Sequence, residues 1–277
     1  MSVLDKMHTR CLATDGCFLS VSIKRRILGF HTIGLATVFI FLSVVTGVWA
    51  NANDEPQELP KPQIRTTPPL YKEWRFDKDA LGAHPVGFQS GAVNGQADGQ
   101  WVVTEEATAP TKSQAVLQQA DCSDDSCYSI LLGDETDVAY VDVSVRLKLP
   151  TSDTMGKAGI VLGAKDEKNF YAAVVTPDTK TIEAFIVRDG KATSFGKAQI
   201  KHAKQDWHHL RVQRSPMMSH DLFNVYFDQH MLLSLSDSTF KEGKVGLITW
   251  GKGDYSFDNL RAIEYVTNLP LSRPPAY

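Results

Sequence analysis

Several kinds of pattern are missing from this sequence, and each absence excludes a class of protein. No stretch keeps the apolar spacing of about 3.6 residues that marks an amphipathic helix, which argues against helices between strands. No second Cys or His pair accompanies Cys122 and Cys127 at ligand spacing, which disfavours a zinc site. No Ser or Cys nucleophile motif is present, so a catalytic triad has no evident starting residue.

Basic charge is also scarce once the N-terminal region is set aside. Residues 1–50 hold five Lys or Arg and two Asp, so the chain's 29 basic and 32 acidic residues leave 24 and 30 beyond residue 50. Phosphate binding needs a basic face, so the resulting net charge of −6 makes nucleic acid and anionic membrane surfaces poor partners. A neutral ligand such as a sugar is compatible with this balance.

The N-terminal region carries an export pattern. A basic cluster at residues 24–26 precedes an apolar run over residues 27–50, which ends in a small-x-small site. We therefore expect residues 24–52 to be a secretory signal peptide or an uncleaved membrane anchor, after an N-terminal extension over residues 1–23. Both alternatives export the following residues to the periplasm or the extracellular space, and only the anchor would attach them to a membrane.

Proline and cysteine mark two features of the exported part. Residues 53–70 are rich in Pro and poor in apolar side chains, which predicts an extended linker, and residues 266–277 are expected to form an irregular tail. Cys122 and Cys127 lie in the exported part, where two cysteines most often pair. We expect a disulfide that pins a short turn, with two free thiols as the alternative.

Short runs of alternating apolar and polar residues, separated by turn-forming residues, extend over residues 71–265. About a dozen such runs predict an all-β domain, a two-sheet antiparallel sandwich rather than a parallel α/β sheet. The phase of the alternation also assigns faces to the side chains. It predicts three core-facing sets: Val141, Val143, Val145 and Leu147; Leu210 and Val212; and Phe223, Val225 and Phe227.

Several of these runs resemble a known family. AGIVLGAKDEKNFYAAVVTP, followed by FIVRDGKATSF, looks like the central hairpins of the 3-keto-disaccharide hydrolase domain family and related laminin G-like jelly rolls. The residues D-x-x-N-F-Y at 166–171 match its first turn, and residues 189–191 match its second. W-H-x-L-R-V, V-Y-F-D and F-D-N-L are similar to its closing strands. The resemblance covers most of residues 74–263.

The resemblance implies a concanavalin A-like jelly roll, whose concave face or rim loops bind glycans in many relatives. Some members cleave sugars, and fold alone does not decide function. We therefore keep three roles open. The first is an exported carbohydrate-binding or accessory module without a catalytic motif. The second is a hydrolase acting on 3-keto-disaccharides or other glycosides, and the third is an envelope protein that binds another protein through a sheet face or edge.

Candidate catalytic groups are few. The segment ETDVAY at residues 135–140 resembles the start of the carboxylate motif of family 16 β-glucanases, but Ala139 or Tyr140 stands where the acid/base belongs. Its acids follow a Gly-Asp step, where they are common turn residues. Strand phase predicts that His208 is a hydrogen-bonded core residue and that His209 faces outward.

Asp258, in the segment FDNL, is a better ligand candidate. Related sandwiches often hold a structural Ca²⁺ where the final strand meets the first, and Asp77 or Asp79 would supply a second carboxylate. The alternative is an Asp-Asn turn that bonds its own backbone. Structural Ca²⁺ is the cofactor that these residues indicate.

For sugar binding, the candidates are aromatic rings near strand ends, since ring faces stack on pyranose faces. Trp250, Tyr255 and Tyr171 lie at such places, and Asp254 belongs to the polar segment that follows Trp250. These four residues form the predicted sugar-binding set. Core packing of the rings is the alternative.

Overall fold

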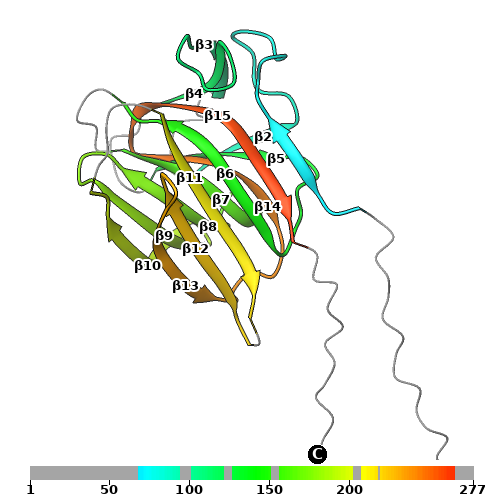
Figure 1. The fold of residues 1–277 in the computed structure, drawn as a ribbon, viewed down its shortest axis with the longest axis vertical. Coiled ribbons are helices and arrows are strands. Elements are labelled where there is room, and N and C mark those ends of the chain that lie inside the picture. Colours follow the sequence, from blue (N-terminus) through cyan, green and yellow to red (C-terminus); the bar gives the residue numbers. More distant parts are fainter. Residues whose placement is uncertain are drawn as a thin grey trace, which may run out of the picture. The chain divides into compact units, whose positions relative to one another are not determined.

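The computed structural model describes residues 68–93, 101–121, 127–150, 156–201, 207–217 and 219–265. These residues form fifteen β-strands and no helix, which confirms the predicted all-β class (Figure 1). Accordingly, this part of the chain holds no helix long and apolar enough to cross a membrane. Several predicted features lie outside the described residues: the N-terminal extension, the export segment, most of the linker, Cys122 and the C-terminal tail.

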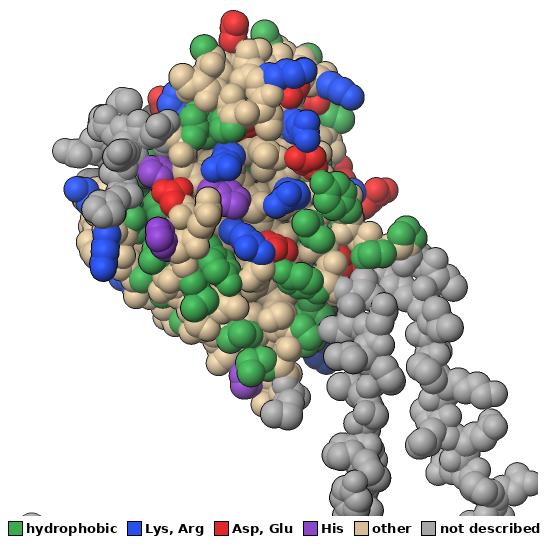
Figure 2. All heavy atoms as spheres, in the orientation of Figure 1, with side chains coloured by type: hydrophobic (Ala, Val, Ile, Leu, Met, Phe, Trp, Pro, Cys, Tyr) green, Lys and Arg blue, Asp and Glu red, His purple; other side chains and the backbone are tan. Residues whose placement is uncertain are grey.

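The larger sheet contains β1 (Tyr71–Trp74), β3 (Trp101–Glu105), β4 (Gln114–Asp121), β6 (Val141–Lys148), β11 (Trp207–Pro216), β12 (Asp221–Phe227), β13 (His230–Asp237) and β15 (Lys252–Glu264). Its order is β13-β12-β11-β6-β15-β4-β3, and β1 pairs with β15 beside this path. All pairings are antiparallel. Figure 2 shows charged side chains on the outer face of this sheet.

The smaller sheet contains β2 (Phe88–Val93), β5 (Tyr128–Gly133), β7 (Lys157–Asp166), β8 (Asn169–Thr176), β9 (Thr181–Arg188), β10 (Lys191–Gln199) and β14 (Lys244–Trp250). Its order is β10-β9-β8-β7-β14-β5-β2, again antiparallel throughout. Strand β14 belongs to this sheet and β15 to the other, so the chain changes sheets at Gly251.

The main core lies between the two sheets. All three sets of side chains that the alternation predicted to face inward are buried in it, so this prediction is confirmed. A second apolar cluster forms on the other face of the smaller sheet. On β8, Tyr171 and Ala173 belong to the core, whereas Phe170 and Ala172 belong to this second cluster. A strand that is buried on both faces has a continuous apolar sequence instead of an alternating one. This explains why the β8 segment NFYAAVVT is apolar over most of its length.

The structure has more strands than the sequence indicates. The segment FNVYFDQHMLLSLSD reads as one alternating run, but it divides into β12 and β13 at Asp228 and Gln229. These two residues have φ values of 46° and 70°. Positive φ at both central residues is the geometry of a tight two-residue hairpin turn. The turn lies at one open edge of the sandwich, because β13 and β10 are the edge strands of their sheets and pack against each other.

Candidate functional site

Polar side chains gather at a junction along one edge of β15. Phe257 pairs with Val116 of β4, and Leu260 pairs with Trp74 of β1, so β4 and β1 follow each other along this edge. The register against β6, on the other edge, shifts between Asp258 and Arg261. Asn259, inside this bulge, has a φ of 49°. The bulge therefore presents Asp258 and Asn259 where β1 ends and β4 begins.

The Asp258 carboxylate is fully buried and held by hydrogen bonds. The backbone N–H of Thr111 donates to Oδ2 at 2.8 Å, and the Thr111 hydroxyl donates to Oδ1 at 2.8 Å. The backbone N–H of Asn259 donates to Oδ1 at 2.6 Å. Burial nevertheless raises the pKa of Asp258; these hydrogen bonds lower it, and the nearby Asp77 carboxylate raises it further.

Three buried oxygens at this junction receive no hydrogen bond from the described residues: Oδ1 of Asp77, Oε1 of Gln114 and Oδ1 of Asn259. Gln114 is the first residue of β4, and Asp77 follows β1 by three residues, so the strand register brings both toward Asn259. A buried acceptor without a hydrogen-bond partner lowers the stability of the fold by about 1–3 kcal/mol. A group of such acceptors therefore indicates a bound ion or water molecule.

These oxygens fit a Ca²⁺ ion, which prefers carboxylate, amide and carbonyl oxygens. No group of three His, Cys, Asp or Glu residues forms a metal site within the described ranges, so such a site depends on the amides of Gln114 and Asn259. Sequence reasoning missed these two residues. Asp79, the alternative to Asp77, instead accepts a hydrogen bond from the Val86 N–H at 3.2 Å.

The predicted sugar-binding rings lie in the interior and in different clusters. Trp250 is 4% exposed and belongs to the second apolar cluster, where it packs against Tyr128 and Phe185 at centroid distances of 5.1 and 5.2 Å. The Lys157 ammonium lies 5.3 Å from the Trp250 ring centroid. The ring is thus enclosed by side chains of its own sheet.

Tyr255 and Tyr171 belong to the core between the sheets, and Asp254 is exposed on β15. The Tyr171 hydroxyl donates to Asp237 at 2.5 Å, and burial together with this bond raises the pKa of Tyr171 to about 12. The structure therefore does not bring Trp250, Tyr255 and Tyr171 together on one surface. Their burial corresponds to the core-packing alternative.

His208 is buried and hydrogen-bonded, as predicted. Its Nδ1 lies 2.7 Å from Oδ2 of Asp228, and its ring stacks on Phe227 at 4.8 Å. The backbone N–H of His209 donates to the other oxygen of Asp228 at 2.8 Å. Two histidines of β11 therefore fix the orientation of the Asp228 carboxylate.

The segment that resembles a glucanase motif lies in the connection between β5 and β6. Glu135 has a φ of 51° in a turn, and the Thr136 hydroxyl donates to the Gly133 carbonyl at 2.8 Å. That hydroxyl also accepts from the Val245 N–H at 3.1 Å. Glu135 and Asp137 thus belong to a hydrogen-bonded turn rather than to a strand that carries catalytic carboxylates.

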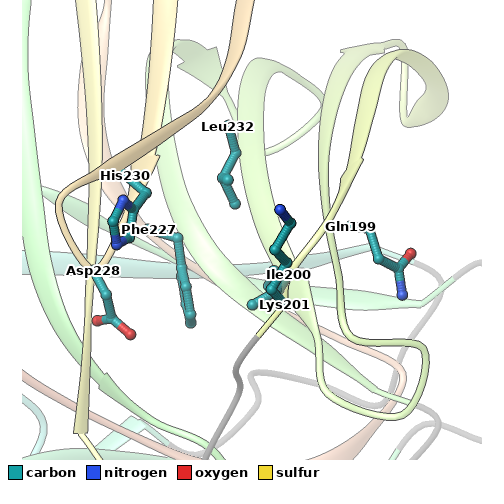
Figure 3. Close-up of a pocket in the computed structure, with 7 residues that line it drawn as sticks. All are labelled: Gln199, Ile200, Lys201, Phe227, Asp228, His230 and Leu232. Atoms are coloured by element: carbon teal, nitrogen blue, oxygen red, sulfur yellow. The ribbon is translucent and has the colours of Figure 1, made fainter.

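A pocket of about 520 Å³ opens at the edge of the sandwich where β10 and β13 pack together. Figure 3 shows its side chains, which come from the end of β10 and from the hairpin of β12 and β13. Apolar walls and polar groups are combined in its lining: Gln199, Ile200, Lys201, Phe227, Asp228, His230 and Leu232. None of them belongs to the predicted sugar-binding set. Sequence reasoning missed this pocket because it read residues 223–237 as one alternating run.

Comparison with known proteins shows the fold. No protein-family model matches the sequence, and no curated protein matches it. The structure is similar to a carbohydrate-binding module, CBM66, from Bacillus subtilis, with a TM-score of 0.52 and 20% identity over 64% of this chain and 96% of that one. The predicted concanavalin-like sandwich is confirmed, whereas membership of the 3-keto-disaccharide hydrolase domain family is not.

Two further solved structures from Bacillus licheniformis are similar at a TM-score of 0.47. One is the GH43 protein BlXynB, with 18% identity over 70% of this chain and 39% of that chain. The other is a β-glucanase, with 11% identity over 73% of this chain and all 100% of that chain.

Proposed function

We propose that this protein is an exported carbohydrate-binding module and that the pocket between β10 and β13 receives the sugar. The observation that carries the proposal is the composition of this pocket. Leu232 and the exposed His230 offer contact to the C–H face of a sugar ring, while Asp228 accepts and Lys201 donates hydrogen bonds to hydroxyls. The structural likeness to a carbohydrate-binding module adds support.

The orientation of Asp228 supports recognition of a specific hydroxyl. His208 and the backbone of His209 hold its two oxygens at 2.7 and 2.8 Å, so the carboxylate is fixed before a ligand arrives. A group that is already oriented loses little conformational entropy on binding. Each carboxylate oxygen keeps a further lone pair for a sugar hydroxyl.

The pocket between β10 and β13 is proposed to bind a sugar without cleaving it. Glycosidases of the common type need two carboxyl groups that flank the scissile bond. The described lining of the pocket holds one carboxylate, Asp228, which is already bonded to His208. We therefore propose binding rather than hydrolysis for this site.

Replacing His230 by alanine should weaken glycan binding by about tenfold, because a lost hydrogen bond with a neutral partner is worth about 1 kcal/mol and its contact area is lost as well. A glycan array would identify the sugar, and isothermal titration would give the dissociation constants. Met231→Ala is the matched control, since its side chain is 55% exposed on the same strand and is not among the pocket residues. Equal affinities in His230→Ala and in the unaltered protein would reject the pocket.

We also propose that Asp77, Gln114 and Asn259 hold a structural Ca²⁺ beside Asp258. Their unpartnered buried oxygens support this proposal. The ion would coordinate these oxygens. Its positive charge would also offset the repulsion between the neighbouring carboxylates of Asp77 and Asp258. It would thereby join the loop after β1, the start of β4 and the bulge in β15.

Added CaCl₂ should raise the melting temperature relative to EDTA, and at a hundredfold excess over Kd the stabilisation would be about 2.7 kcal/mol. Asp77→Ala should abolish this response, whereas the matched variant Asp79→Ala should keep it. The response should also grow as the pH rises through the raised pKa of Asp258, because the ionised carboxylate beside the site attracts Ca²⁺ more strongly. Identical melting curves in EDTA and CaCl₂ would end the proposal.

A further inference from the structure

Basic side chains from three neighbouring strands meet on the outer face of the larger sheet. His209 of β11 lies opposite Arg146 of β6, while Arg211 of β11 and Arg261 of β15 both lie opposite Ser144 of β6. Adjacent strands are about 4.8 Å apart, so these residues form one compact group. We call Arg146, His209, Arg211 and Arg261 the basic row. Figure 2 shows Lys and Arg side chains gathered around a His on this face.

The acidic neighbours of the basic row neutralise only part of it. Asp258, which lies opposite Arg146, accepts hydrogen bonds from Thr111 and Asn259 instead. Asp142 pairs with Arg211, and Nε lies 2.8 Å from Oδ1. Glu73, opposite Arg261 on β1, bonds instead to Arg75 at 3.1 Å. Across the described residues, Arg146 and Arg261 make no ion pair. Positive charge therefore remains on this face of a chain whose overall net charge is −3.

The pKa of His209 reflects the positive charge of the basic row. Its ring is half-buried, and burial lowers its pKa first, followed by the charges of Arg146, Arg211 and Arg261; only Asp228 opposes them. Like charges on neighbouring strands repel each other, and a bound anion would relieve this repulsion. Guanidinium groups suit such an anion because their planar forks match carboxylate and sulfate oxygens.

Aromatic side chains on the same face indicate what kind of molecule carries the anion. Trp207 lies two residues before His209 on β11 and faces the same way, and its Nε1 donates to the Thr108 hydroxyl at 3.0 Å. Tyr226 of β12 lies opposite Arg211, whose guanidinium is 5.2 Å from the ring centroid. Half-buried rings beside basic groups provide stacking contact for sugar rings as well as charge for acidic groups.

We infer that the basic row binds the carboxylate or sulfate groups of an acidic polysaccharide. This goes beyond the pocket between β10 and β13, because the residues of the basic row are not among those that line the pocket. An extended polymer fits the geometry, since the row crosses three strands and presents cations side by side to successive acidic groups. The half-buried rings of Trp207 and Tyr226 beside the basic row favour a sugar polymer over an anionic lipid surface as the partner.

The double variant Arg146→Ala/Arg261→Ala tests the inference. The probes are polygalacturonate for carboxylate, dextran sulfate for sulfate and plain dextran as the neutral polymer, with dissociation constants measured by titration calorimetry. We expect the unaltered protein to bind an acidic polymer more tightly than dextran and the double variant to bind it about tenfold or more weakly, because two charge-assisted pairs are lost. The matched control Lys191→Ala/Lys241→Ala removes the same charge from exposed positions elsewhere.

Binding of an acidic polymer should also raise the pKa of His209, which NMR titration would follow, because an added anion offsets the three arginine charges. The inference fails if neither acidic polymer binds better than dextran, or if both double variants lose affinity equally. Binding to phosphatidylglycerol vesicles without binding to either acidic polymer would also overturn it, in favour of a membrane surface. His230→Ala, which affects the pocket, should leave the affinity for acidic polymers unchanged.

Discussion

Replacing Arg214 by alanine is expected to lower the free energy of unfolding by about 3–5 kcal/mol, the usual effect of removing one partner of a buried ion pair. The Arg214 side chain is 1% exposed, and its Nε and Nη2 donate to Asp221 Oδ2 at 3.0 and 2.5 Å. It also donates to the Phe240 carbonyl and lies 5.4 and 5.5 Å from the rings of Tyr171 and Phe223. The substitution would leave Asp221 unpaired and a cavity between the rings.

Urea denaturation would measure this loss. Lys197→Ala is the control, because its ion pair with Glu183 is 3.6 Å long and its side chain is 55% exposed, so a loss of about 0–1 kcal/mol is expected. The double variant Arg214→Met/Asp221→Leu should recover much of the stability, since it removes both buried charges. If Arg214→Ala were no more harmful than Lys197→Ala, the buried pair would have no special role.

Trp250→Ala should lower the free energy of unfolding by about 3–5 kcal/mol, since it removes a large buried ring and leaves a cavity. The ring packs against Tyr128 and Phe185 and under the Lys157 ammonium, so the variant loses contacts on several sides. Trp250→Phe keeps part of this volume and should lose less. Glycan affinity of the folded fraction should stay unchanged in both variants.

Stability and binding measured on the same Trp250 variants separate packing from recognition. A loss of stability below about 1 kcal/mol together with lost glycan binding would contradict the packing role and support the sequence-based prediction that Trp250 contacts sugar.

Local alternation was sufficient to predict the sandwich because it determines which side chains can share a core. Val141, Val143 and Val145 alternate with polar residues, and all three are buried between the sheets. Alternation cannot show that the opposite face of a sheet is also covered. Trp250, beside a polar glycine-containing segment, therefore looked like a rim residue, although it belongs to the second apolar cluster.

The candidate sites depend on contacts that no local pattern records. Asp258 was a candidate because related sandwiches often hold Ca²⁺ where the final strand meets the first. The proposed role of Gln114 depends on strand pairing between distant parts of the chain. The pocket likewise requires β10 to pack against β13 from the other sheet. The basic row requires Arg146 and Arg261 to share a neighbour through antiparallel register, which their separation in sequence does not reveal.

The pairing of β1 with β15 has a mechanical consequence. Tyr71 lies opposite Ile263, and the Glu264 N–H donates to the Leu70 carbonyl at 2.9 Å, so the first and last strands enter and leave at the same end of their ladder. A force applied between residues 70 and 264 would pull this ladder open one hydrogen-bonded pair at a time, from Tyr71 toward Trp74, instead of shearing all pairs together. The sandwich should therefore yield first at β1 when it is stretched by its two ends, while the rest of both sheets stays closed.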